Sequence, residues 1–358
     1  MNEDRTPQTP PIIKAVTDCE SRPRWSVMIP AYNCIGYLQT ALESVLIQDP
    51  GPEIMQIEVV DDHSTDGDVR ALVARVGKGR VGYYRQPYNR GSLRNFETCL
   101  NRSKGHLVHL LHGDDAVLPG FYRVTGALFD AHPQVGAAFT SHIVIDECGN
   151  QVYSRQSLMD KPGVLSDWLS TIARRQRLQP PAIVVKRLVY EHLGGFFAFH
   201  FNEDWEMWVR IAAHYPVAYS PERLARYRYH TNNITTRSFL SGQNILDIYK
   251  AIDIIQHYLP PEKRKSYKRS ARKYKSIYIA HKSHQLYNEY GTTHAALLQA
   301  KAAFKMSRNL NTIYIILKLY IKKLIGYKFL KKRTLRFFEK LKERNADSEP
   351  VPVNRLKE

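Results

Sequence analysis

The sequence predicts an α/β fold with a mostly parallel sheet flanked by helices, followed by a helical, basic C-terminal region. Short apolar runs alternate with amphipathic stretches over about 120 residues, which is typical of parallel strands joined by crossover helices. Two of these apolar runs are followed closely by pairs of aspartates. The third observation is a net charge of +18, which is concentrated near the C-terminus.

The first predicted strand, residues 25–30, is a short apolar run that ends at a proline. Helix 36–48 follows, because Leu38, Leu42 and Val45 recur at helical spacing. The alternation then continues with strands at 56–60, 80–85, 106–111 and 135–145 and with helices at 67–76, 91–103 and 119–131. In such sheets, ligands bind at the carboxyl ends of the strands.

The rest of the chain is predicted to be mixed up to residue 235 and helical after about residue 241. The predicted helices are 165–176, 186–193, 204–213, 243–258, 264–307 and 312–344. Pro260-Pro261 separate 243–258 from 264–307, and Gly291 breaks the latter stretch. The expected organisation is a flexible leader at 1–23, a folded body at 24–240, a helical basic region at 241–345 and a disordered tail at 346–358.

The positive charge belongs almost entirely to residues 261–344, which hold 23 Lys and Arg against 4 Asp and Glu. The remaining chain carries 29 basic and 30 acidic residues, so the body is nearly neutral. Within the basic segment, residues 313–325 form an amphipathic pattern with lysines and tyrosines, which favours binding to an anionic membrane surface. The alternative is a helical hairpin packed on the body. Nucleic acid is not expected as a partner, because no nucleic-acid-binding motif is present.

Several classes of protein are disfavoured. The four cysteines contain no CxxC pair, which argues against a structural zinc site or a disulfide framework and favours a reducing compartment. The N-terminus lacks the apolar stretch of a signal peptide. No run of about 18 uncharged apolar residues occurs, so no transmembrane helix is expected.

Asp61-Asp62 and Asp114-Asp115 each follow a predicted strand. Since the carboxyl ends of parallel strands meet at one edge of a sheet, we expect both pairs at the same rim. Gathered carboxylates repel each other unless a cation or a hydrogen-bonding ligand lies between them, as a ribose and a metal-bound diphosphate would. Either pair alone equally fits a polar cap of the following helix, but the two together favour a binding site.

Seven short motifs occur in order between residues 24 and 235. They are VMIPAYN (27–33), EVVDDHSTD (58–66), NRG (89–91), HGDD (112–115), GGF (194–196), EDWEMWVR (203–210) and YRYH (227–230). This ordered set resembles the family 2 glycosyltransferases of the GT-A fold. The resemblance implies a nucleotide-binding half at 24–145 and an acceptor half at 146–240.

The resemblance also implies roles for individual residues. Asp62 would hold the base of a nucleotide-sugar donor. The other donor-binding residues would be Pro30, Ala31, Tyr32, Asn33, Asn89, Arg94 and Asp114. A divalent metal, Mn²⁺ or Mg²⁺, would bind Asp115 with Asp114 and His230. Glu203 and Asp204 would form the catalytic pair, with Asp204 as the general base.

The implied activity is inverting transfer of a sugar to a hydroxyl group, which needs a base to take the proton of that hydroxyl. The resemblance favours UDP as the nucleotide, with dTDP and GDP as alternatives. The acceptor would be a polyprenyl-linked or growing surface glycan, met by a cytoplasmic enzyme peripheral to the inner face of the cell membrane. Transfer to a protein, or a catalytically silent nucleotide-sugar-binding or membrane scaffold protein, are the alternatives. The sugar, the linkage and the oligomeric state stay open.

Two residues depart from the family pattern: His63 replaces a small residue, and His112 replaces an aspartate found in many members. A metallohydrolase site with His109 and His112 is disfavoured, because positions three apart on a strand face opposite ways. Taken alone, Glu203-Asp204 also fits the acidic first turn of a helix. The spacing of Trp205 and Trp208 is more typical of core residues than of a sugar-stacking platform.

Overall fold

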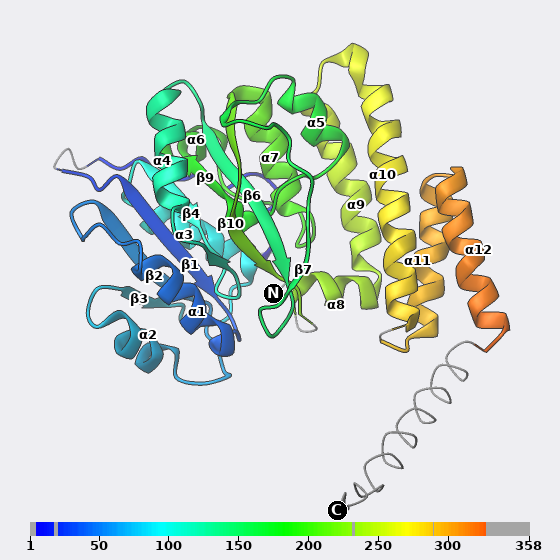
Figure 1. Cartoon of the computed structure of the whole chain (residues 1–358), viewed down its shortest axis with the longest axis horizontal. Coiled ribbons are helices and arrows are strands. Elements are labelled where there is room, and N and C mark those ends of the chain that lie inside the picture. Colours follow the sequence, from blue (N-terminus) through cyan, green and yellow to red (C-terminus); the bar gives the residue numbers. More distant parts are fainter. Residues whose placement is uncertain (1–4, 18–20, 231–232, 289, 327–358) are drawn as a thin grey trace, which may run out of the picture. The chain divides into compact units, whose positions relative to one another are not determined.

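The computed structural model describes residues 5–17, 21–230, 233–288 and 290–326 (Figure 1). The chain divides into two compact units, residues 1–274 and 275–358. The first unit is an α/β body, and the second is helical where it is described. The compact body therefore extends past residue 240, where the sequence predicted its end, to Tyr274.

The predicted parallel strands form one side of the sheet, in the order β3-β2-β1-β4. Their bounds are β1 (Trp25–Ala31), β2 (Met55–Asp61), β3 (Gly82–Arg85) and β4 (Leu107–Leu110). All seven residues of β1 are buried. A strand covered on both faces needs a continuous apolar run, and the sequence Trp-Ser-Val-Met-Ile-Pro-Ala is close to one.

Helices connect these strands within a few residues of the predicted bounds. They are α1 (Ile35–Leu46), α2 (Val69–Gly77), α3 (Ser92–Arg102) and α4 (Phe121–Ala131). In α1 the residues Leu38, Leu42 and Val45, which predicted the helix, are all fully buried in the core. The helical spacing therefore identified both the helix and its buried face.

The second half of the sheet contains two main strands that the sequence did not predict, one of which is antiparallel to its neighbours. Strand β9 (Ile183–Lys186) lies between β4 and β6 (Ala137–Ile145) and is antiparallel to both. Strand β10 (Val217–Arg228) runs parallel to β6. The short strands are β5 (Ala116–Val117), β7 (Gln151–Ser154) and β8 (Gly163–Val164). The sheet is thus mixed and mostly parallel along its main strands.

The remaining helices follow the predicted pattern, and α8 is an addition to it. They are α5 (Trp168–Arg174), α6 (Arg187–Leu193), α7 (Glu203–His214), α8 (Ile234–Ser241), α9 (Gln243–Ile255), α10 (Pro261–Asn288), α11 (Thr293–Met306) and α12 (Leu310–Leu324), with 3₁₀ turns at Pro180–Ala182 and Gln256–Tyr258. The predicted stretch 264–307 is two helices, divided near Gly291, whose φ is 68°.

Residues 5–17 are packed against the body, so the prediction of a flexible leader is wrong for this segment. The Ile13 side chain is only 2% exposed. The carbonyl oxygens of Pro7 and Pro11 accept hydrogen bonds of 2.8 Å from the amides of Ala198 and Gly195. A polar, proline-rich composition suggested flexibility, but one buried isoleucine and these backbone bonds hold the segment in place.

In the second unit, polar side chains join the start of the unit to α12. The hydroxyls of Ser276 and Thr312 lie 2.9 Å apart, and the Asn309 amide donates to Ser276 at 3.0 Å. The predicted helix 312–344 is described only to Leu324, and the predicted disordered tail at 346–358 lies outside the described residues. Among the described helices, none is long and apolar enough to cross a membrane.

Gly105 provides a test of the packing between β1 and β4. A Cβ at this position would lie 2.4 Å from the carbonyl carbon of Trp25 and 2.6 Å from the amide nitrogen of Ser26, which are backbone atoms of β1. We expect Gly105→Ala to lower the free energy of unfolding by about 3 kcal/mol or more, because the central strand must shift.

Gly36→Ala is the matched control, because nothing lies within 4 Å of its Cβ position in α1. It should leave the free energy of unfolding unchanged or raise it by up to about 1 kcal/mol. Urea unfolding of both variants measures the difference. Equal stabilities would contradict close packing at Gly105.

Candidate active site

The carboxyl end of β1 anchors the two loops that carry the acidic pairs. The amide of Asp62 donates to the Ala31 carbonyl at 2.8 Å, and the amide of Gly113 donates to the Pro30 carbonyl at 3.1 Å. The loop after β2 therefore lies on one side of β1 and the loop after β4 on the other. Both acidic pairs lie at the same edge of the sheet, as the alternation of strands and helices predicted.

Asp61 is a structural residue. It is fully buried, and its carboxylate accepts hydrogen bonds from the Ser64 amide, the Tyr83 hydroxyl and the Arg85 guanidinium, each at 2.8 Å. Its charge is paired with Arg85. These bonds tie the end of β2 to β3, and they account for one member of the first acidic pair without any ligand.

Asp62 organises the loop between β3 and α3. Its carboxylate accepts bonds from the Asn89 side chain (2.8 Å), the Arg90 amide (2.7 Å) and the Gly91 amide (2.8 Å). Burial raises the pKa of Asp62, while the two backbone amides and the charge of Arg5 act in the opposite direction. A carboxylate can accept about four hydrogen bonds, so one further donor can still bind to Asp62.

Other predicted donor-binding residues surround this loop to different degrees. Asn33 accepts from the Thr65 amide at 2.8 Å, which joins the loops after β1 and β2. Tyr32 is 43% exposed beside the buried Ala31. Arg94 forms an ion pair of 2.7 Å with Glu97 on its own helix. The ring of His63 bonds to the Gln86 carbonyl at 3.2 Å.

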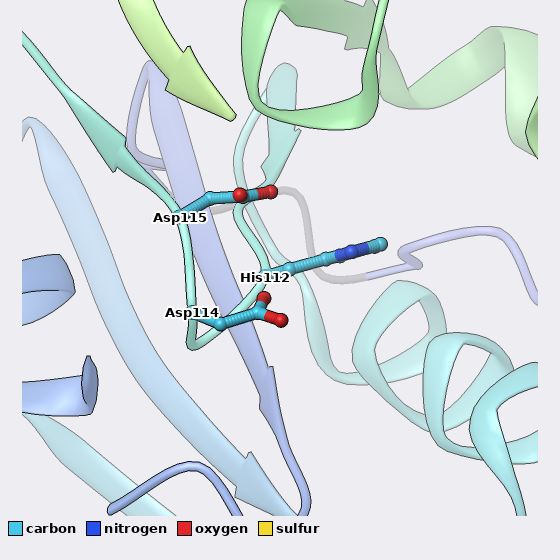
Figure 2. Close-up of side chains that lie close together, drawn as sticks. All are labelled: His112, Asp114 and Asp115. Carbon is cyan, nitrogen blue, oxygen red and sulfur yellow. The ribbon is translucent and has the colours of Figure 1, made fainter. Parts of the chain in front are cut away.

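The second acidic pair forms a cluster with His112. In Figure 2, the side chains of His112, Asp114 and Asp115 extend toward the same space, and their potential ligand atoms all lie within 4.8 Å of one another. Asp115 is 1% exposed, and its Oδ1 accepts from the Arg228 amide at 2.8 Å. Its Oδ2 is buried and has no hydrogen-bond partner among the described residues. A divalent cation would satisfy this oxygen, so the cluster fits a metal.

The electrostatics of the cluster also fit a cation. Burial and the neighbouring charge of Asp114 raise the pKa of Asp115 well above its usual range. Burial acts to raise the pKa of Asp114 too, but the hydrogen bond and charge of His230 and the charge of His112 lower it overall. Burial lowers the pKa of His112, although the charge of Asp114 acts in the opposite direction. A lowered pKa favours the neutral imidazole, the form that binds metals.

His230 and Arg228 support the cluster from β10 and the segment after it. His230 Nε2 lies 2.9 Å from Asp114 Oδ2, so the histidine that was predicted as a metal ligand contacts an aspartate. Arg228 bonds to Asp115 through its amide, and its Nε donates to the Asp114 carbonyl at 2.9 Å. Sequence reasoning gave Arg228 no role, although it lies in the YRYH motif beside His230.

Glu203 and Asp204 begin α7, as predicted. Asp204 is 8% exposed, and its carboxylate accepts from the Gln176 side chain at 2.5 Å and from the Trp205 amide at 2.7 Å. Burial and the charges of Asp204 and Asp247 raise the pKa of Glu203 well above its usual range. Gln176 was missed, because nothing in its polar, arginine-rich surroundings distinguishes it.

One small cavity lies between His112 of the cluster and the Glu203-Asp204 pair. Its lining residues include His112, Glu203, Asp204, Phe96, Phe196 and Trp208. The ring of His112 stacks on Phe96, with the ring centroids 5.1 Å apart. Trp205 and Trp208 are 0% and 3% exposed. Trp205 Nε1 donates to the Ile172 carbonyl at 2.7 Å, which is typical of a core residue, whereas Trp208 lines the cavity.

Comparison with known proteins agrees with this geometry. The family model described as Glycosyl transferase family 2 matches residues 26–202. An uncharacterized protein of Mycobacterium tuberculosis, MT1568, is 30% identical over 239 residues, which cover 63% of this chain and 74% of that protein. The chain belongs to glycosyltransferase family 2. The putative glycosyltransferase EpsE of Bacillus subtilis is 24% identical over 238 residues, 64% of this glycosyltransferase and 82% of EpsE.

Solved structures show the same fold. Staphylococcus aureus TarS 1–349 in complex with UDP-GlcNAc aligns with a TM-score of 0.58 and 14% identity, over 79% of this chain and 80% of TarS. Mannosyltransferase PcManGT from Pyrobaculum calidifontis, in complex with GDP-Man and Mn²⁺, aligns with a TM-score of 0.52 and 17% identity, over 94% and 91% of the two chains. The predicted GT-A fold is thereby confirmed for this glycosyltransferase.

The bonds to Asp62 can be tested by Asp62→Asn, which replaces one acceptor oxygen with a donor that faces the amides of Arg90 or Gly91. We expect both amides to exchange hydrogen about tenfold faster or more, because the loop loses its anchor. Asp68→Asn is the control, since Asp68 caps α2 and asparagine caps a helix equally well. Hydrogen exchange of these amides can be followed by mass spectrometry or NMR. Unchanged protection of residues 89–91 in Asp62→Asn would contradict the role of Asp62 as the anchor of this loop.

Proposed function

We propose that this enzyme is an inverting glycosyltransferase that moves a sugar from a nucleoside-diphosphate sugar to a hydroxyl group. One observation carries the proposal: a single cavity is lined by His112 of the acidic cluster and by the Glu203-Asp204 pair. A diphosphate bound at the cluster would place its sugar toward this cavity. An acceptor hydroxyl entering the cavity would then meet a carboxylate able to take its proton.

The nucleotide would bind at the end of β1 and the loops on either side of it. Asp62 has capacity for one further donor, such as the N–H of a uracil ring. The exposed ring of Tyr32 and the buried Pro30 and Ala31 would form the floor of the pocket. UDP is the favoured nucleotide, and the structural neighbour TarS, which binds UDP-GlcNAc, supports it. GDP and dTDP are the alternatives.

Asp115, with Asp114 and His112, would hold a divalent metal. When bound, the metal would neutralise the negative charge that develops on the leaving diphosphate. Carboxylate ligands and a phosphate partner suit Mn²⁺ or Mg²⁺, and the neighbour PcManGT was solved with Mn²⁺. His230 would orient Asp114 through their 2.9 Å contact and so support this site, whether or not it also reaches the metal.

Asp204 would be the general base. The Gln176 amide can only donate to the Asp204 carboxylate, so it fixes the orientation of that carboxylate and favours its charged form. Glu203 would have the complementary role, because burial and the charge of Asp204 raise its pKa and so favour the protonated form, which can donate a hydrogen bond. Two neighbouring carboxyl groups with different protonation states are a common arrangement in acid–base catalysis.

The acceptor is proposed to be a polyprenyl-linked or growing surface glycan. One relative supports this acceptor: a GalNAc(5)-diNAcBac-PP-undecaprenol β-1,3-glucosyltransferase of Campylobacter jejuni is 33% identical over 101 residues, 27% of this chain and 32% of that protein. Such an acceptor lies at a membrane, so the enzyme would work peripherally on the cytoplasmic face. No nucleic-acid partner is proposed.

The exposed face of α12 supports membrane binding. Apolar side chains recur along it every three or four residues and are 56% to 85% exposed: Leu310, Tyr314, Leu317, Ile321 and Leu324. The opposite face, with Ile315, Ile316 and Leu319, packs inside the second unit. Lys318, Lys322 and Lys323 lie on the same helix. An exposed apolar stripe on a helix that also carries lysines is suited to an anionic lipid surface.

The activity is tested with purified enzyme, Mn²⁺ or Mg²⁺ and a panel of nucleotide sugars. We expect Asp204→Asn to retain donor binding, measured as a thermal shift, and to lower the rate of transfer or donor hydrolysis by about 10²–10⁴-fold, because the base is lost. Asp253→Asn, at a surface ion pair with Lys268, is the control. Undiminished transfer by Asp204→Asn would exclude Asp204 as base. Binding without turnover by the wild type would favour a silent nucleotide-sugar-binding protein.

Flotation with phosphatidylglycerol vesicles tests the stripe on α12. We expect Leu317→Asp/Ile321→Asp to lower the bound fraction about tenfold or more, since two apolar contacts are replaced by charges that the lipids repel. Ile47→Asp is the control, because it places a charge at an exposed isoleucine of the first unit. Equal flotation of the α12 variant and the wild type would show that the stripe does not contact the membrane.

A further inference from the structure

Residues 5–14 cross two loops that flank the candidate active site, and we name them the N-terminal strap. One loop, residues 89–91, is bound by Asp62; the other, residues 194–202, leads into Glu203-Asp204. The strap lies outside residues 26–202, the part matched by the family model. Its partners Asn89 and His200 lie within the matched residues.

Arg5 reaches Asp62 through Asn89. Its guanidinium donates to the Asn89 side-chain oxygen and, at 3.3 Å, to the Asn89 carbonyl. Asn89 Nδ2 donates in turn to Asp62 Oδ2 at 2.8 Å. A guanidinium can only donate and a carboxylate can only accept, so the two partners together allow one orientation of the amide between them. Arg5 also lies against Gly91, whose Cβ would be 3.3 Å from Arg5 Nε.

The next residues of the strap reach the second loop. The Thr6 hydroxyl lies 2.8 Å from His200 Nε2, and His200 Nδ1 lies 3.1 Å from the Ser92 hydroxyl. His200 therefore joins the strap, the loop before α7 and the start of α3. The Pro7 carbonyl adds a bond of 2.8 Å from the Ala198 amide. One short segment thus contacts the donor side and the acceptor side of the site.

The far end of the strap is held by the body. Ile13 is buried, and the Lys14 carbonyl accepts from Arg187 at 2.7 Å. Gly194 has a φ of 77°, and a Cβ there would lie 2.8 Å from Pro10, so the strap lies directly on the backbone of this loop. Because this end of the strap is fixed, the few hydrogen bonds of Arg5 and Thr6 can hold the loops 89–91 and 194–202 in position.

We propose that the N-terminal strap holds the 89–91 loop in its donor-binding geometry and that Arg5 is a positioning residue for the nucleotide. The inference rests on the proposed nucleotide-sugar activity. Arg5 fixes the Asn89 amide, and Asn89 together with the amides of Arg90 and Gly91 fixes the Asp62 carboxylate that would bind the base. Loss of Arg5 would weaken binding of the nucleotide while the reacting groups at Asp115 and Asp204 stay in place.

The test is Arg5→Ala in the full chain. We expect the KM for the nucleotide sugar and the Kd for the free nucleoside diphosphate each to rise about five- to tenfold, with kcat changed less than twofold. Arg5→Lys should give an intermediate rise, because it keeps the charge but loses the forked donor. Lys14→Ala is the control: it removes the same charge from the strap, but Lys14 bonds through its backbone.

Two further measurements separate the strap from the proposed activity. Without any donor, Arg5→Ala should speed hydrogen exchange at the amides of Arg90 and Gly91 by about fivefold or more, and Lys14→Ala should not. The double variant Arg5→Ala/Asn89→Ala should bind the nucleoside diphosphate no more weakly than Asn89→Ala alone, because Arg5 acts through Asn89. Unchanged exchange and unchanged KM in Arg5→Ala would overturn the inference. If Arg5→Ala speeds exchange but the wild type binds no nucleotide sugar, the proposed function is refuted. The strap would then still hold the 89–91 loop in position.

Discussion

The site depends on the hydrogen bonds that the end of β1 makes on both sides. Carbonyl groups of Pro30 and Ala31 accept the amides of Gly113 and Asp62, so the loops after β4 and β2 are held on opposite sides of one buried strand. A strand buried on both faces cannot shift without disturbing the helices that cover it. The separation of the two acidic loops is therefore set by the core of the protein.

The buried carboxylates at this edge are compensated in different ways. Asp61 is paired with Arg85 and needs nothing more. Asp62 is satisfied by amides, with capacity for one further donor. Asp115 keeps a buried oxygen without a partner among the described residues. A cation bound to this oxygen would offset the cost of burying it without a hydrogen-bond partner. The Asp114-Asp115 pair therefore fits a metal, and the Asp61-Asp62 pair does not.

Particular residues show how much of this was predictable. The spacing of Leu38 and Leu42 predicted α1 and its buried face, and the acidic pairs after two apolar runs predicted one edge of the sheet. The antiparallel strand β9 was missed, because four apolar residues between helices carry no periodicity. His112 was noted as a departure from the family pattern and weighed in a disfavoured metallohydrolase site. Arg228 was assigned no role, and Gln176 had no local signal at all. Residues 5–17 were wrongly expected to be flexible from their composition.

The sequence by itself determined the main strands and crossover helices up to residue 145, the family and the motifs that carry the acidic residues, because each of these depends on neighbouring positions in the chain. Only the tertiary structure decided which residues form the hydrogen bonds that hold these motifs and their acidic side chains in place. Arg5 and Asn89 are 84 positions apart, Asp115 and Arg228 are 113 apart, and Gln176 and Asp204 are 28 apart. Such bonds depend on where the packed core places each loop, and no local pattern of side chains specifies that placement.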